Sequence, residues 1–291
     1  MRFDRSLKMP SVPPHNSTRL IGKIPVTEQC EDLCGHCLAL LDSPESVDDE
    51  HTVHEIRVAT KRLRAAWLLA KDANPKLANQ RRKALRKLSG AIADRRDRSV
   101  LKELAEELAE EPGKHRDHGR AFARLADRLD RSDGTPPPCS STTLKLLLAG
   151  WKKERKAWRH LDLGDDIACR RQFRRALRDS EKLATRRTRE ALADATATVW
   201  HEWRKAVKRL RYQREFVAAS QGRRPGVRDA RIKRLGTRLG ERNDLDNLVV
   251  ASQRHANDEG SHHAHVRKAI ALRERQVMGN ARRLGRLAFL R

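Results

Sequence analysis

The stretch Val53-His-Glu-Ile-Arg-Val-Ala-Thr-Lys-Arg-Leu-Arg64 occurs a second time, little changed, as Trp200-His-Glu-Trp-Arg-Lys-Ala-Val-Lys-Arg-Leu-Arg211. Each copy carries one histidine and four or five Lys or Arg residues. His201 follows His54 by 201 − 54 = 147 residues. The same offset relates later pairs: Arg95 and Arg242, Asp97 and Asp244, Leu101 and Leu248, His115 and His262, His118 and His265. A repeat of this length indicates that a basic helical unit was duplicated.

Hydrophobic residues recur at helical spacing in both halves, and the sustained alternation typical of strands is absent from the sequence. Prolines and glycines divide each half into four helices. The third of these is predicted to run unbroken from about residue 76 to residue 110. The sequence therefore predicts an all-α protein of two pseudo-symmetric four-helix bundles with a connecting helix. The predicted units are a flexible N-terminal tail (1–24), the first four-helix repeat (25–131), a proline-rich linker with the connector helix (132–164), and the second repeat (165–291).

The composition is strongly basic, with 64 Lys and Arg against 39 Asp and Glu and a formal net charge of +25. A surplus of this size is normally neutralised by a polyanion, so nucleic acid, an anionic membrane and polyphosphate are the candidate partners. No run approaches the roughly 18 apolar residues that span a bilayer, and the N-terminus lacks a signal-peptide core. The five cysteines show no disulfide framework. We therefore expect a cytoplasmic protein with no membrane partner.

A helical projection of the repeated segment separates an apolar stripe from a basic band. The stripe contains Ile56, Leu63 and Trp67 in the first copy, and Trp203 and Leu210 in the second. The band consists of His54, Arg57, Lys61 and Arg64, and of His201, Arg204, Lys208 and Arg211. Like charges at these spacings repel, so the band is unfavourable unless an anion occupies it. The planar fork of Arg and the point charge of Lys both suit phosphate, and a histidine beside phosphate can become a further cation.

Two pairs of residues leave alternatives open. Arg95 and Arg242 each precede an aspartate by two residues. They either form a structural Arg–Asp network at the end of a bundle or add cations to the ligand surface. His118 and His265 each lie three residues after another histidine, an arrangement that could hold a metal. Their polar surroundings favour exposure to solvent instead.

Cys30, Cys34 and Cys37 have a spacing that resembles a metal-binding motif. On a helix, however, the three thiols share one face with Leu33 and Leu41. We therefore expect small buried hydrophobic side chains there and no metal site.

The H-x-x-R-x-x-x-K-R-L-R helix, present twice and followed each time by an L-x-x-L-G-like segment and R-x-D, resembles the CHAD domain, the conserved histidine α-helical domain. The resemblance covers about residues 25–290 and implies two pseudo-twofold-related four-helix bundles that bind inorganic polyphosphate through a basic surface or channel. It also implies an association with polyphosphate granules. The binding residues it implies are His54, Arg57, Lys61, Arg62, Arg64, His201, Arg204, Lys208, Arg209 and Arg211, with Arg95 and Arg242 as further candidates.

The sequence departs from the family pattern in two respects. The first half reads Leu-Ser-Gly-Ala at residues 88–91, where the second reads Leu235-Gly236, so helix packing is expected to differ there. The E-x-E-x-K motif of the CYTH triphosphatase domain, which often accompanies CHAD domains, is absent from this sequence. We therefore expect no triphosphatase activity.

The favoured function is non-catalytic binding of inorganic polyphosphate, without cofactor or metal. Nucleic-acid binding is the alternative on the same charges, although aromatic residues are few and no DNA-binding motif is recognised. A phosphohydrolase or a phospho-accepting histidine protein is the third possibility, but neither His54 nor His201 has an evident carboxylate or metal partner in the sequence. The oligomeric state is left open.

Overall fold

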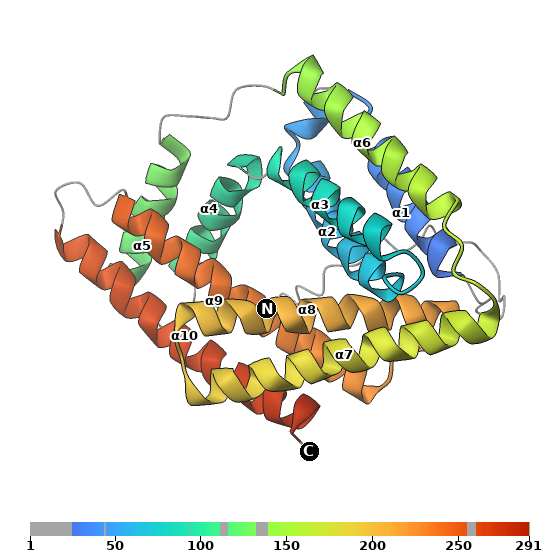
Figure 1. The fold of residues 1–291 in the computed structure, drawn as a ribbon. Helices are drawn as coiled ribbons and strands as arrows, with labels where there is room; N and C mark the ends of the chain where they lie inside the picture. Colours follow the sequence, from blue (N-terminus) through green and yellow to red (C-terminus); the bar gives the residue numbers. More distant parts are fainter. Residues whose placement is uncertain are drawn as a thin grey trace.

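The structure is a computed structural model, and it describes residues 25–43, 45–92, 94–110, 116–131, 139–254 and 260–290. This part of the chain is built from α-helices and one short 3-10 helix and contains no strand, so the predicted all-α class is confirmed (Figure 1). In chain order the helices are α1 (Val26–Ala39), α2 (Glu50–Leu69), α3 (Pro75–Gly90), α4 (Asp94–Glu110), α5 (Arg116–Arg131), α6 (Ser141–Arg159), α7 (Asp166–Ala193), α8 (Ala197–Ser220), α9 (Val227–Arg254) and α10 (Gly260–Phe289).

Short polar side chains cap the start of several helices. Asp49 accepts a hydrogen bond from the Thr52 backbone N–H at 2.7 Å and caps α2. Asn74 caps α3 in the same way, and Pro75 supplies the favourable first helical residue. These local signals explain why the breaks between helices are visible in the sequence.

One predicted boundary is wrong. The expected helix from residue 76 to residue 110 is two helices, α3 and α4, which are separated after Gly90. Glycine destabilises a helix relative to alanine, and the negative charge of Asp94 favours the start of a new helix. The equivalent part of the second half, α9, continues as one helix of 28 residues.

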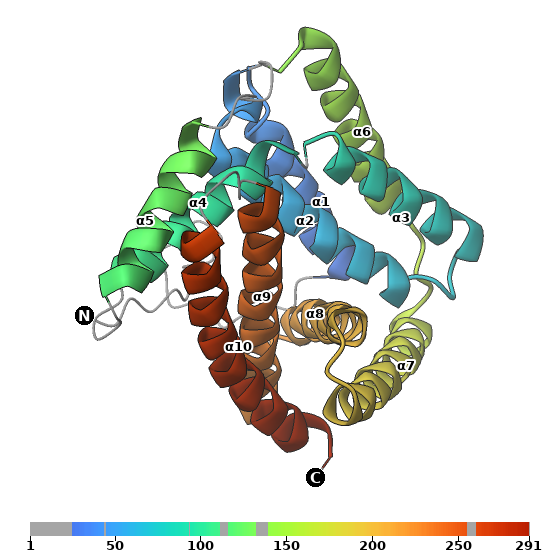
Figure 2. The ribbon, with the colours of Figure 1, turned by 90° about the vertical axis from the view of Figure 1, so that its left-hand side faces the viewer.

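Among the described residues, the buried apolar side chains form three clusters. The first joins α1, α2, α3 and α6 with parts of α7 and α8. The second joins α7, α8, the first part of α9 and the end of α10. The third joins α4 and α5 with the remainder of α9 and α10 (Figure 2).

The third cluster contains helices from both repeats. The predicted arrangement of two four-helix bundles, one for each repeat, is therefore not confirmed. The physical reason is the length of α9 and α10, which continue past the second cluster and reach α4 and α5. The predicted connector, α6, packs along α1 and buries Trp151 and Trp158 in the first cluster.

The apolar stripe of each motif helix is confirmed. Ile56, Leu63 and Trp67 of α2 are fully buried, as are Trp203 and Leu210 of α8. Because the stripes face the core, the basic band of each helix lies beside the packed face. No helix in the described residues is both long enough and apolar enough to cross a membrane.

Candidate functional site

The two motif helices, α2 and α8, pack against each other and bring the two copies of the repeated segment together (Figure 1). The side-chain amide of Gln213 donates a hydrogen bond to the backbone oxygen of Ala65 at 3.3 Å. The guanidinium carbon of Arg62 lies 5.6 Å from the centroid of the Phe216 ring. Through these contacts, the basic bands of both helices lie beside the interface between α2 and α8.

Cations from the two bands are close enough to interact electrostatically. Arg57 acts on Arg204, and Lys61 acts on Lys208. In both pairs the second residue follows the first by 204 − 57 = 208 − 61 = 147 positions, which is the offset of the repeat. The two copies therefore meet at equivalent positions and form one group of charges, which we call the central cation cluster (Arg57, Lys61, Arg204 and Lys208).

The environment of Lys208 disfavours its charged form. Burial, followed by the repulsion of Arg204 and Lys61, lowers the pKa of this amine from an ordinary 10.5 to about 7, while Asp244 of α9 acts in the opposite direction. The backbone of α9 also comes close, since a Cβ atom at Gly240 would lie 3.9 Å from the Lys208 Nζ atom. An anion beside this amine would favour its charged form again.

The surroundings of Arg204 also disfavour its charged form. Burial lowers the pKa of its guanidinium, Asp244 and Tyr212 oppose this shift, and Arg57 adds to it. The Nε atom of Arg204 is buried and has no hydrogen-bond partner among the described residues. A buried N–H group of this kind is normally paired, so the arrangement suits a bound acceptor such as a phosphate oxygen.

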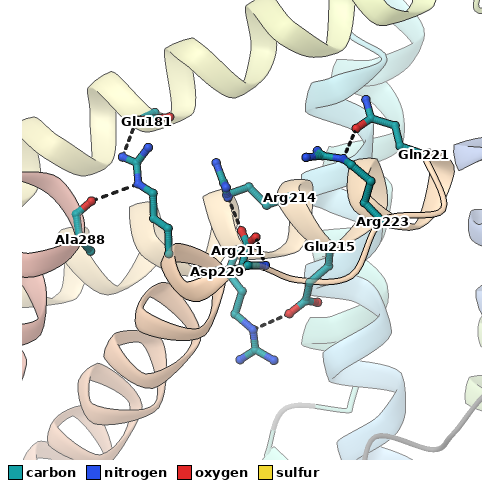
Figure 3. A network of polar contacts seen from close by, with 10 residues as sticks. Glu181, Arg211, Arg214, Glu215, Gln221, Arg223, Asp229 and Ala288 are labelled. Carbon is teal, nitrogen blue, oxygen red and sulfur yellow. Dashed lines mark hydrogen bonds and ion pairs between the residues drawn. The ribbon is translucent and has the colours of Figure 1, made fainter.

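Arginines nearer the C-terminal end of α8 have carboxylate partners within the protein. The Nε atom of Arg211 donates to Glu215 at 2.7 Å, and Arg214 donates to Asp229 at the start of α9 (Figure 3). These pairs tie α8 to itself and to α9, and their charge is locally compensated. In the central cation cluster, Asp244 acts on both Arg204 and Lys208.

Arg64 and Arg209, both predicted site residues, extend the basic surface toward α3 and α7. Burial lowers the pKa of both guanidinium groups. For Arg64 the next strongest causes are Arg86 and Arg82 of α3. Arg209 donates from Nε to the Ser180 hydroxyl oxygen of α7 at 3.0 Å.

Arg242 belongs to a structural network. Its guanidinium forms ion pairs with Asp246 at 2.8 Å and Glu274 at 3.0 Å, and it lies 5.0 Å from the centroid of the Trp200 ring. The side chain is only 7% exposed. The structure therefore shows a network, in which Asp246 and Glu274 take the place expected for Asp244. A role of Arg242 in the ligand surface stays a prediction, and the residue lines the same small pocket as His201 and Arg204.

Three other predicted site residues have different settings. His54 is partly buried on α2, whereas His201 is exposed and its Nδ1 atom lies 3.3 Å from the Asn243 Oδ1 atom. His201 also lines a small surface pocket beside Arg204. Arg95 lies in α4, but its side chain is outside the described residues, so its role stays a prediction.

The expectation that His118 is exposed to solvent is wrong. His118 is only 8% exposed, and its ring centroid lies 5.7 Å from that of His265. The two residues are equivalent in the repeat and meet because α5 packs against α10. Their sequence neighbours His115 and His262 lie outside the residues whose side chains are described.

The cysteine prediction is confirmed as far as burial is concerned. Cys30, Cys34 and Cys37 are fully buried in the first cluster, and burial raises the pKa of each thiol. They therefore act as small apolar side chains. In the described part of the chain, no group of three or more His, Cys, Asp or Glu residues is arranged to hold a metal ion.

Sequence reasoning missed three residues of the basic surface. Arg82 and Arg86 reach it from α3, and Asp244 supplies a negative charge from α9. The spacing of Arg82 and Arg86 places them on one helix face, which was a usable signal. Their proximity to α8 depends on helix packing and has no sequence signal.

The sequence matches the CHAD domain family over residues 27–254, and the chain belongs to this family. No curated protein matches the chain. Among solved structures, the crystal structure of the CHAD domain from the plant Ricinus communis has a TM-score of 0.62 at 20% sequence identity. The alignment covers 95% of this chain and 97% of that one, so the two share a fold over nearly their whole length.

Proposed function

We propose that this protein binds inorganic polyphosphate at the central cation cluster, without catalysing its turnover, and that it associates with polyphosphate granules in cells. The observation that supports this proposal best is the convergence of like charges from both motif helices. Burial and mutual repulsion lower the pKa of Lys208 and Arg204, so the cluster is unfavourable in the free protein. A polyanion that occupied the cluster would relieve this repulsion.

The chemistry of the cluster suits phosphate. Arg57 and Arg204 supply planar forks that can contact two oxygens of one phosphate, and Lys61 and Lys208 supply point charges. Polyphosphate repeats the same anionic group along its length, so one chain can contact several cations at once. Membership of the CHAD family supports this choice of ligand.

The burial of aromatic side chains favours polyphosphate over single-stranded nucleic acid. All five tryptophans are at most 1% exposed. Tyr212 and the described phenylalanines are also buried. Proteins that bind single strands without sequence preference stack bases on accessible aromatic rings, and the described residues offer none.

Titration with polyphosphate of defined chain lengths at two salt concentrations tests the proposal. We expect binding that weakens steeply with salt, because cations of the cluster replace counterions of the polyanion. Duplex DNA, added as a competitor, should displace polyphosphate poorly. Easy displacement by DNA would assign the basic surface to nucleic acid, and release of phosphate in the presence of Mg²⁺ or Mn²⁺ would contradict the non-catalytic role.

Lys208 gives polyphosphate binding an expected pH dependence. With a pKa of about 7 the amine is mostly neutral at pH 8 in the free protein, and a bound polyanion raises this pKa. Binding should therefore take up roughly one proton at pH 8, and affinity should fall as pH rises above 7, by up to about tenfold per pH unit. The charged groups that act on this amine are Arg204, Lys61, Asp244 and Arg211.

Proton uptake is measured by calorimetric titration in buffers with different ionisation enthalpies. The control is Lys208→Arg, whose guanidinium keeps its charge and which should bind without this uptake. Measurements at pH 8 and above avoid the range in which histidines ordinarily titrate. Equal proton uptake by both proteins would contradict the assignment to Lys208.

A further inference from the structure

The amine of Lys208 is uncompensated, in contrast to that of another lysine on the same helix. Lys208 forms no hydrogen bond or ion pair with the residues that the structure describes. Lys205, three residues earlier on α8, is exposed and donates a hydrogen bond to Glu202 at 2.7 Å. Lys205 is therefore a matched reference for the chemistry of Lys208.

Charged groups from three helices surround the Lys208 amine. Arg204 and Arg211 of α8 and Lys61 of α2 repel its charged form, and Asp244 of α9 acts in the opposite direction. Arg204 lies four residues before Lys208, on the same face of α8. The buried Nε atom of Arg204 has no hydrogen-bond partner in the described part of the chain. The amine therefore lies beside a donor that suits a phosphate oxygen.

A small reactant can reach this amine. The Lys208 side chain is only partly buried. On the α9 side the nearest glycine is Gly240, at which a Cβ atom would lie 3.9 Å from Nζ. Because glycine has no side chain, α9 places only backbone over the amine at this point.

Burial and the neighbouring cations make the neutral form of the Lys208 amine dominant. With a pKa of about 7, most of these amines are neutral at about pH 7.5. An ordinary lysine amine is neutral in only about one molecule in a thousand at that pH. The neutral amine has the free electron pair that attacks an electrophile, and lysines beside other cations are activated in this way.

We propose that Lys208 is a self-acylation site for small acyl phosphates, the mixed anhydrides of a carboxylic acid and phosphoric acid. The phosphate group binds to Arg204 and the neighbouring cations, which places the carbonyl carbon beside the amine. The nitrogen attacks this carbon, the bond from the carbon to the bridging oxygen breaks, and the departing phosphate takes the proton from the nitrogen. The products are an amide on Lys208 and one inorganic phosphate.

Acylation of Lys208 removes one charge from the central cation cluster and so regulates it. This consequence rests on the proposed function, because it assumes that the cluster binds polyphosphate. The acylated protein should bind polyphosphate about tenfold more weakly, since one charge-assisted contact is lost. Bound polyphosphate should protect Lys208 from acylation, because it covers the amine and favours the charged form.

The test treats the free protein with acetyl phosphate at about pH 7.5 and compares Lys208 with Lys205 by peptide mass spectrometry. We expect Lys208 to react at least about tenfold faster, because its larger neutral fraction outweighs the lower nucleophilicity of a weaker base. The rate at Lys208 should level off above about pH 8, whereas the rate at Lys205 should keep rising with pH. Equal rates at the two lysines would overturn the proposal.

N-hydroxysuccinimidyl acetate is the control reagent, because it transfers the same acetyl group without a phosphate. The preference for Lys208 over Lys205 should be several-fold greater with acetyl phosphate, and excess inorganic phosphate should slow the reaction with acetyl phosphate by competition. An equal preference with both reagents would contradict the binding of the donor by the cation cluster.

The variant Lys208→Arg separates this inference from the proposed function, because its guanidinium keeps the charge and is not acylated. After treatment with acetyl phosphate, the wild type should lose about tenfold in affinity for polyphosphate, and the variant much less. Equal losses would overturn the regulatory role of Lys208. Failure of the untreated wild type to bind polyphosphate would instead overturn the proposed function, and the preference of acetyl phosphate for Lys208 would still be measurable.

Discussion

Reversing the charges of Arg57 and Arg204 together, as Arg57→Glu/Arg204→Glu, is expected to weaken polyphosphate binding by about 100-fold or more. Each arginine lies in the central cation cluster, where a contact to phosphate is a charge-assisted hydrogen bond worth about 1.5–3 kcal/mol. Two such losses amount to about 3 kcal/mol or more, and 1.4 kcal/mol corresponds to about tenfold in affinity. The new carboxylates would also repel the ligand.

The variant should fold as well as the wild type does. The carboxylate introduced at position 204 attracts Lys208 where Arg204 repels it, and this attraction opposes the new repulsion between the carboxylate and Asp244. Circular dichroism and thermal unfolding check this before binding is measured.

The matched control is Lys145→Glu/Lys152→Glu on α6, which changes the net charge by the same amount at exposed positions. We expect this control to lose little affinity, and to lose it mainly at low salt, because long-range attraction between exposed charges is screened. Equal losses in the two variants would mean that binding follows net charge alone, and the central cation cluster would no longer be the site.

Replacing Glu154 with alanine is expected to lower the free energy of unfolding by about 3–5 kcal/mol. Glu154 of α6 is fully buried and accepts hydrogen bonds from Arg81, at 2.8 Å from Nε, and from the indole N–H groups of Trp67 and Trp158. Its removal leaves the buried guanidinium of Arg81 without this carboxylate and the two indoles without their acceptor. Burial raises the pKa of Glu154, while Arg81 and the indole donors act in the opposite direction.

Chemical denaturation measures the loss, with Lys153→Ala as the control on the same helix. Lys153 is exposed, and we expect its replacement to change stability by no more than about 0.5 kcal/mol. The double variant Arg81→Leu/Glu154→Leu should lose less than Glu154→Ala, because it leaves no buried charge. A cost of less than about 1 kcal/mol for Glu154→Ala would contradict the role of this network.

Much of the fold is visible in the sequence because its signals are local. The apolar stripes of α2 and α8 follow from helical spacing, and all five of the stripe residues named above are buried. The capping residues at Asp49 and Asn74 mark helix starts through contacts three residues away. The boundary between α3 and α4 was missed, since Gly90 and Asp94 are weaker signals than the proline at residue 75.

The candidate site was predicted in composition but not in arrangement. The repeat identified all four residues of the central cation cluster, although each cation could have served a separate patch. Arg242 shows the limit of this reasoning, because the same pattern of arginine and aspartate placed it equally in a network and in the ligand surface. Its contacts with Asp246 and Glu274 appear only in the tertiary structure, and they establish the network.

The sequence by itself determined the duplication, the all-α class, the buried stripes and the residues of the basic bands, because helical periodicity and side-chain chemistry act over a few residues. The tertiary structure alone decided that Arg57 meets Arg204, that α3 adds Arg82 and Arg86, and that α4, α5, α9 and α10 share one core. These contacts join residues far apart in the chain. They depend on how whole helices pack, and no local pattern specifies that packing.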